Sequence, residues 1–209
     1  DPVTRLGYLA DIACPAVDEC WAVGAGTRPL VLHLKGGRWS REIVTRPAED
    51  SGASDRFLVS VACASADQCW AIGFSRPEPD ADSYDPFLVR LGGFAPVVLP
   101  TPLPWPGAIA CPKADDCWMT SGAERMPPSD PSDGPPVSVP PAVAHWDGAA
   151  WTVTNLVNPY YSRYEKIEGI ACPLPEACWI LGSALTGDAS DPRKEHWAPV
   201  IYLGIPTSG

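Results

Sequence analysis

Aromatic side chains stand in the irregular, proline-rich segments of this chain, where a ligand could reach them. A flat aromatic ring packs against a sugar or an apolar side chain, and neighbouring polar groups fix the orientation of what is bound. The same rings suit a structural role, in which they cover the backbone of long loops. The residues predicted to bind a ligand are Tyr84, Trp105, Tyr160, Tyr161, Arg163, Tyr164 and Trp197.

Three carboxylates lie close together in one of these segments, at Asp80, Asp82 and Asp85. Calcium takes hard oxygen ligands, and alternating acids in a loop can supply them. The segment lacks the glycine and the final glutamate of an EF-hand loop. A calcium site and a solvated acidic loop are therefore both open interpretations, and no other cofactor is predicted.

Catalytic motifs are absent. The chain has no Gly-x-Ser-x-Gly elbow, phosphate loop or dinucleotide fingerprint. His33 and His145 recur at one position of a repeated pattern, which indicates a structural role, whereas His196 lies in a variable segment beside Glu195 and is an acid–base candidate. Paired carboxylates for glycoside hydrolysis stay open, because 25 acidic residues offer many pairs. No catalytic residue is assigned.

A repeated element must position these segments. The pattern Ile-Ala-Cys, five residues, then Cys-Trp-Ala-Val-Gly occurs in four closely similar copies, whose first cysteines are Cys14, Cys63, Cys111 and Cys172. A repeat of about fifty residues is typical of a β-propeller, in which each repeat is one blade. The sequence therefore predicts an all-β, four-bladed propeller of four-stranded antiparallel blades. It forms a single domain over residues 1–209, with blades at about 9–47, 57–102, 107–157 and 167–205.

All eight cysteines belong to these copies. Self-similar repeats should pair within themselves, and zinc motifs usually space their cysteines by fewer residues. Four disulfides indicate an oxidising, extracellular compartment. The predicted bridges are Cys14–Cys20, Cys63–Cys69, Cys111–Cys117 and Cys172–Cys178.

Each copy predicts a hairpin whose strands are joined by a five-residue connection and a disulfide across it. An acid precedes each second cysteine by two positions and is expected to fix the turn, at Asp18, Asp67, Asp115 and Glu176. The repeated tryptophans are expected to pack between blades, at Trp21, Trp70, Trp118 and Trp179.

The second half of each copy predicts a third strand, a glycine turn and an outer strand, except that the fourth copy ends before its outer strand. Residues 3–6 resemble the outer strand of the third copy. We therefore expect residues 3–6 to complete the last blade beside residues 201–203. This would close the ring and protect the edge that an open array exposes.

The repeat unit, Cys-x5-Cys-Trp-Ala-Val-Gly followed by Val-Leu-His-Leu-x-Gly-Gly-x-Trp, resembles repeats of secreted bacterial β-propeller proteins and is distantly similar to sialidase-type, BNR-like repeats. The resemblance covers nearly the whole chain. It implies a propeller but no particular activity, because such propellers serve as lectins, adhesion modules, scaffolds and sometimes enzymes. The Ser-x-Asp-x-Gly-x-Thr-Trp box of sialidase repeats is absent.

Long, variable segments connect the strands at one edge of the predicted blades, and short turns connect them at the other. Binding residues are expected at the edge with the long segments, here called the long-loop face. The net charge of −10 argues against nucleic acid and anionic membranes as partners, and no apolar run is long enough to insert into a membrane. The sequence favours a secreted, lectin-like module that binds a carbohydrate or a cell-surface ligand. A protein–protein scaffold or a subunit of an extracellular complex is the alternative, followed by a polysaccharide hydrolase or lyase.

Overall fold

The computed structural model describes residues 7–26, 29–42, 44, 56–76, 85–91, 96–97, 103, 106–122, 124–126, 137–157, 165–174, 177–187 and 195–203. Every regular element in these ranges is a β-strand, which confirms the all-β prediction. Within these ranges there is no helix with the length and apolarity needed to cross a membrane.

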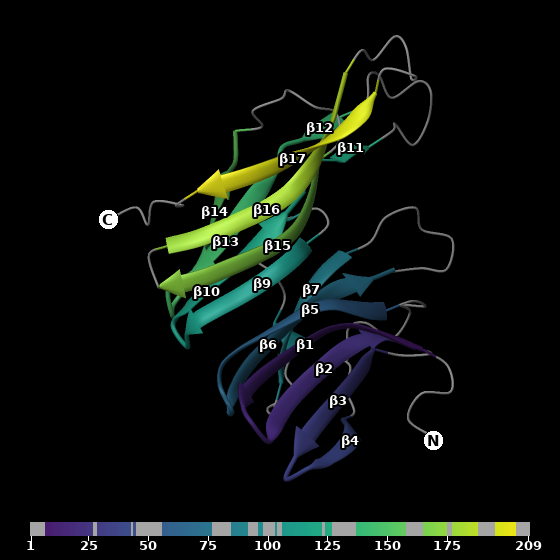
Figure 1. Cartoon of the computed structure of the whole chain (residues 1–209), viewed down its shortest axis with the longest axis vertical. Coiled ribbons are helices and arrows are strands. Elements are labelled where there is room, and N and C mark those ends of the chain that lie inside the picture. Colours follow the sequence, from purple (N-terminus) through teal and green to yellow (C-terminus); the bar gives the residue numbers. More distant parts are fainter. Residues whose placement is uncertain are drawn as a thin grey trace.

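Antiparallel strands form one unit for each cysteine repeat (Figure 1). Unit one consists of β1 (Tyr8–Ala16), β2 (Glu19–Ala25), β3 (Leu30–Lys35) and β4 (Arg38–Glu42). Unit two consists of β5 (Arg56–Ser65), β6 (Gln68–Ser75), β7 (Asp85–Leu91) and β8 (Pro96–Val97). Consecutive strands pair within each unit, and a single ladder contact between Ala25 and Phe57 joins the two units.

The other two units follow the same order with one insertion and one omission. Unit three consists of β9 (Pro106–Lys113), β10 (Asp116–Ser121), β13 (Ala142–Trp146) and β14 (Trp151–Asn155). A separate hairpin of β11 (Glu124–Met126) and β12 (Val137–Val139), which the sequence did not predict, is inserted between β10 and β13. Unit four has three described strands, which are β15 (Glu165–Leu174), β16 (Ala177–Thr186) and β17 (His196–Leu203).

All four predicted disulfides are present, but the hairpins they close are tighter than predicted. The expected five-residue connection is wrong, because both strands continue between the cysteines. In unit two, Cys63 and Cys69 are direct ladder partners, and Ser65 still pairs with Gln68. Each disulfide therefore joins neighbouring strands inside the ladder.

The final glycine of the repeat faces a bulge in the first strand. In unit two the ladder shifts register between Leu58 and Ser60, and units one and four shift at the corresponding place. A side chain at Gly24, Gly73 or Gly182 would overlap a backbone carbonyl oxygen of the paired first strand. The bulge brings the two backbones so close that only glycine fits there.

Apolar side chains from successive units meet in three buried clusters. Trp21 and Val23 of unit one pack with Leu58 and Val61 of unit two. A second cluster lies between units two and three and includes Ile72, Leu88, Ile109 and Met119. A third lies between units three and four and includes Trp118, Val143, Ile167 and Ile180. The core is therefore a series of interfaces, and in each of them a sheet face of one unit packs against the next unit.

The motif tryptophans pack between units in three of the four copies. Trp21 and Trp118 are buried, and Trp70 is partly buried against the cluster between units two and three. The prediction is wrong for Trp179, which is 50% exposed. Trp179 lies on the far side of unit four, where none of the described units packs on it.

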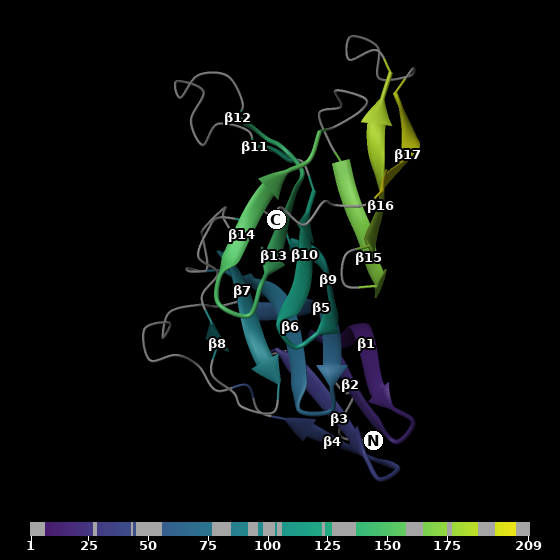
Figure 2. The same cartoon turned by 90° about the vertical axis from the view of Figure 1, so that its left-hand side faces the viewer.

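The units form an open array in the described residues. Their first strands β1, β5, β9 and β15 contact one another in that order, and units one and four lie at its opposite ends (Figures 1 and 2). No described strand of unit four pairs with a strand of unit one. Residues 3–6, expected to close the ring, lie outside the described residues, so the closed four-bladed ring stays a prediction.

Candidate functional site

The two edges of the array differ in the connections that leave them. Two-residue turns join the first two strands of units one, two and three at one edge. At the opposite edge, β6 ends at Ser75 and β7 begins at its ladder partner Asp85, while β16 ends at Thr186 and β17 begins at its partner His196. Long connections thus leave this second edge, as the sequence predicts.

Trp197 is the one predicted aromatic ligand residue that lies within the described ranges. It follows the start of β17, is paired with Leu185 of β16, and is 48% exposed. Lys166 of β15 places its Nζ 5.3 Å from the centroid of the Trp197 ring. A cation over an indole face is attracted by the negative face of the ring, and this contact orients both side chains.

Hydrogen-bonding groups also lie at the end of this hairpin. The Thr186 hydroxyl lies 3.1 Å from His196 Nε2, and the same hydroxyl donates to the His196 carbonyl oxygen at 3.2 Å. Both contacts are exposed at the end of the β16–β17 hairpin. The hairpin end therefore carries an exposed indole ring with an ammonium group over it and, at the next ladder pair and so on the opposite face, a hydroxyl–imidazole pair.

Sequence reasoning missed Lys166 and Thr186. Neither belongs to a motif, and their proximity to Trp197 and His196 depends on the register of β16 with its two neighbours. Trp197 was predicted to lie in an irregular segment, and this is wrong, because it belongs to strand β17.

The other predicted binding residues are not placed by the structure. Tyr84, Trp105, Tyr160, Tyr161, Arg163 and Tyr164 lie outside the described residues. Of the predicted metal ligands, Asp80 and Asp82 also lie outside them, and Asp85 is an exposed residue at the start of β7. Among the residues that the structure describes, no three acids, histidines or cysteines gather in a way that could hold a metal.

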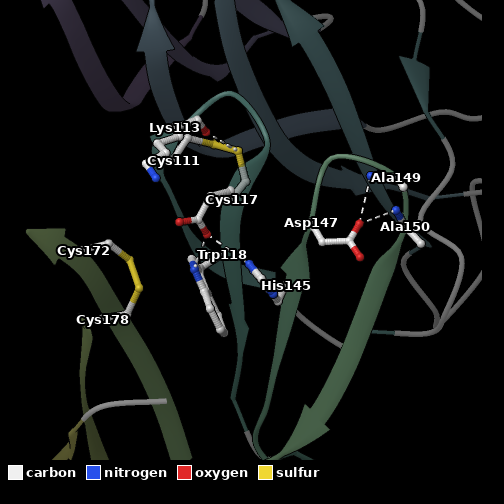
Figure 3. A network of polar contacts seen from close by, with 11 residues as sticks. Cys111, Lys113, Cys117, Trp118, His145, Asp147, Ala149, Ala150, Cys172 and Cys178 are labelled. Atoms are coloured by element: carbon white, nitrogen blue, oxygen red, sulfur yellow. Dashed lines mark hydrogen bonds and ion pairs between the residues drawn. A yellow bond between two sulfur atoms is a disulfide. The ribbon is translucent and has the colours of Figure 1, made fainter. Parts of the chain in front are cut away.

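The two recurrent histidines belong to a structural arrangement. In unit three, Trp118 and His145 stack with ring centroids 4.0 Å apart (Figure 3). One oxygen of Asp116 accepts from Trp118 Nε1 at 2.8 Å and lies 3.0 Å from His145 Nε2. The indole is buried, so this carboxylate satisfies a donor that water does not reach.

Unit one repeats the stack with a longer acid. Trp21 and His33 stack with centroids 3.8 Å apart, and Glu19 Oε1 lies 3.3 Å from His33 Nε2. Trp21 Nε1 is buried and has no hydrogen-bond partner among the described residues. The acids that contact the stacked rings are thus Glu19 and Asp116. Each lies one position after a predicted turn acid, Asp18 or Asp115.

Replacing Glu19 with aspartate should stabilise the protein. An unsatisfied buried donor costs about 1–3 kcal/mol, and aspartate at this position would reproduce the geometry by which Asp116 contacts both rings in unit three. We expect Glu19→Asp to raise the free energy of unfolding by about 1 kcal/mol in urea denaturation followed by tryptophan fluorescence. The reverse change, Asp116→Glu, should lower it. An unchanged midpoint for Glu19→Asp beside a lowered one for Asp116→Glu would contradict the prediction.

The turn between β13 and β14 is closed by a carboxylate. Asp147 accepts from the backbone N–H groups of Ala149 and Ala150, both at 2.8 Å (Figure 3). These N–H groups, that of Ala150 foremost, stabilise the charged form and lower the pKa of Asp147. Gly148 in the same turn has φ = 92°, which favours glycine. The predicted glycine turn is therefore present, and Asp147 has a structural role.

Comparison with known proteins leaves the family open. No protein-family model matches the chain, and no curated protein matches it. Among solved structures, one described as "YCF48 bound to D1 peptide" is similar over 95% of this chain and 70% of that chain, with 14% identity and a TM-score of 0.42. A likeness at this level assigns neither ligand nor partner, so the site must be argued from its own residues.

Proposed function

We propose that the chain is a secreted binding module that recognises a carbohydrate at the edge from which the long connections leave. The observation that carries this proposal is Trp197, a half-exposed indole with Lys166 over its ring. Sugars offer apolar C–H faces that pack on an aromatic ring and hydroxyl groups that bond to neighbouring donors and acceptors. Lys166 provides such a group over the ring.

The compartment and the architecture belong to the same proposal. Four disulfides in 209 residues are typical of extracellular proteins, and they support secretion. The four repeated units, with the motif tryptophans of three of them packed between units, support the interpretation that each unit is a propeller blade. Residues 3–6 are proposed to complete the outer edge of the fourth blade. The variable segments then extend from a rigid scaffold, which is where binding residues usually lie.

A glycan array with the purified, oxidised protein tests the function. We expect binding to a restricted set of glycans, and Trp197→Ala should weaken it about tenfold or more, which corresponds to about 1.4 kcal/mol. Trp39→Ala is the matched control, because Trp39 is 44% exposed on β4 in unit one, far from the site. A double variant, Trp105→Ala with Tyr161→Ala, tests the predicted aromatic residues outside the described ranges.

The other outcomes discriminate between the remaining functions. Loss of binding in EDTA would assign a calcium ion to the segment with Asp80, Asp82 and Asp85. Binding that survives Trp197→Ala but is lost in the double variant would place the site on the other segments. No binding to any glycan would refute the proposal and favour a protein scaffold, and turnover of a polysaccharide lost on substitution of one carboxylate would favour a hydrolase or lyase.

A further inference from the structure

The outer face of unit four, here called the end face, is apolar and exposed. It consists of Trp179 and Leu181 on β16 and Ile201 on β17, and Leu181 and Ile201 are ladder partners. Their exposed fractions are 50%, 53% and 64%. Single exposed apolar residues are normal in proteins, but a contiguous apolar group on one sheet face indicates an interaction surface.

The corresponding residues of the preceding units are buried by the next unit. In unit one the same ladder positions are Trp21, Val23 and Val31, and all three lie in the cluster between units one and two. Their exposed fractions are 4%, 0% and 0%. The end face thus has the composition and register of a face that another unit covers.

Unit one carries the complementary surface, here called the start face. Leu9 and Ile12 on β1 are 50% and 55% exposed. Their counterparts in unit two, Leu58 and Val61, are 0% and 5% exposed, because they pack against Trp21 and Val23 of the preceding unit. The start face therefore has the side chains that an end face meets at an interior interface.

A chain of polar contacts runs through the first two interfaces and begins at unit one. Asp11 Oδ2 accepts from Ser60 Oγ at 2.7 Å and from the Val61 N–H at 2.9 Å, and Ser60 Oγ in turn accepts from the Ile109 N–H at 3.3 Å. Units one and two thus each supply an acceptor for an N–H of the next unit, whereas unit three has Ala108 at this place.

The start face needs no such acceptor. In unit one the equivalent N–H belongs to Ile12, and it donates to Asp11 Oδ1 of its own strand at 2.8 Å. In unit four, Gly169 stands at the place of Asp11 and Ser60 and has no side chain to offer. A contact between end face and start face is therefore apolar and leaves this N–H satisfied.

We propose that the end face of one copy of the chain packs against the start face of a second copy. Within one chain the two faces lie at opposite ends of the array (Figure 1). Closing it on itself would require the three existing interfaces to repack, and close-packed interiors resist such changes. A second copy buries both faces and leaves those interfaces as they are.

The contact is heterologous, since two different patches meet, and a dimer forms if the rotation between copies closes the ring at two. Each end face covers the partner's start face, which gives a ring of eight units, within the range of about four to eight blades that propellers use. Trp197 is four residues before Ile201 on β17, on the same sheet face and nearer the end of the hairpin.

Sedimentation or light scattering behind a sizing column tests this proposal on the oxidised wild-type chain across a concentration series. We expect twice the mass of one chain. Leu181→Arg on the end face and Ile12→Arg on the start face should each halve the mass while preserving the far-UV circular dichroism spectrum, because both side chains are exposed. Val153→Arg is the matched control, since Val153 is exposed on β14 and belongs to neither face. It should leave the mass unchanged.

A wild-type chain that is monomeric at every concentration would overturn the proposal. If the unfolding temperature of that monomer fell in Leu181→Arg and Ile12→Arg but not in Val153→Arg, the two faces would instead be closing a four-unit ring within one chain. A dimer that persists in both arginine variants would also refute it. Glycan binding is measured separately, so a failure here and a failure of the proposed function are distinguishable.

Discussion

Reduction of the four disulfides should unfold the protein at room temperature. Each bridge closes a loop with a sequence separation of 6, and a loop this short contributes about 2 kcal/mol in the chain-entropy model. Four bridges together contribute about 8–9 kcal/mol, which is comparable with the whole stability of a typical domain, about 5–15 kcal/mol. Sulfurs such as that of Cys69 are also buried, so thiols would replace packed bridges in the core.

Far-UV circular dichroism and tryptophan fluorescence in a reducing buffer measure this effect. The oxidised protein in the same buffer without reductant is the control. A paired replacement, Cys14→Ala with Cys20→Ala, removes one bridge and should lower the free energy of unfolding by about 2 kcal/mol. If the reduced protein retained its urea midpoint, the bridges would be dispensable for the fold.

Truncation of Trp118 should destabilise the protein strongly, whereas the same truncation of Trp179 should not. The two residues hold the same place in their repeats, but Trp118 is 2% exposed and Trp179 is 50% exposed. Trp118→Ala removes a buried indole from the interface of units three and four and leaves Asp116 without its indole donor. A cost of about 3–5 kcal/mol is typical of such a change.

Trp179→Ala removes a half-exposed ring and should cost less than about 1 kcal/mol in the isolated chain. Urea denaturation of both variants at low protein concentration, where association is weakest, gives the comparison. Equal losses in the free energy of unfolding would show that Trp179 is buried as Trp118 is. At low protein concentration, the residues that bury Trp179 would have to belong to the same chain. Little effect from either would contradict the packing described for unit three.

Much of the local structure could be predicted from the repeat alone. Self-similarity limits the cysteine pairing to partners within one copy. Apolar runs separated by a glycine turn predict pairs of strands, such as those on either side of the turn at Gly148. The bulges beside Gly24 and Gly73 were not predicted, because a glycine inside a strand can mark a bulge or another close backbone approach, and only the pairing of the strands distinguishes them. The inserted β11–β12 hairpin was missed because short strands in a proline-rich segment give little periodic signal.

The candidate site was predicted only in part. Trp197 was singled out as an aromatic residue of a variable segment, but its cationic neighbour Lys166 comes from another strand, at a distance along the chain that no motif connects. Likewise, the acids that matter to the tryptophan–histidine stacks are Glu19 and Asp116. Which acid reaches the rings depends on the ladder register, where a shift of one residue turns a side chain to the other face.

The sequence by itself determined the four cysteine hairpins, their disulfides and the all-β class, because these depend on contacts between residues close along the chain. Only the tertiary structure decided that Trp118 is buried and Trp179 exposed, since burial depends on whether another unit packs on the same sheet face. It likewise left Leu9 and Ile12 exposed at the other end of the array. Similar local sequences acquire different environments according to their place in the array, because apolar surface is stabilised only where a neighbour removes it from water.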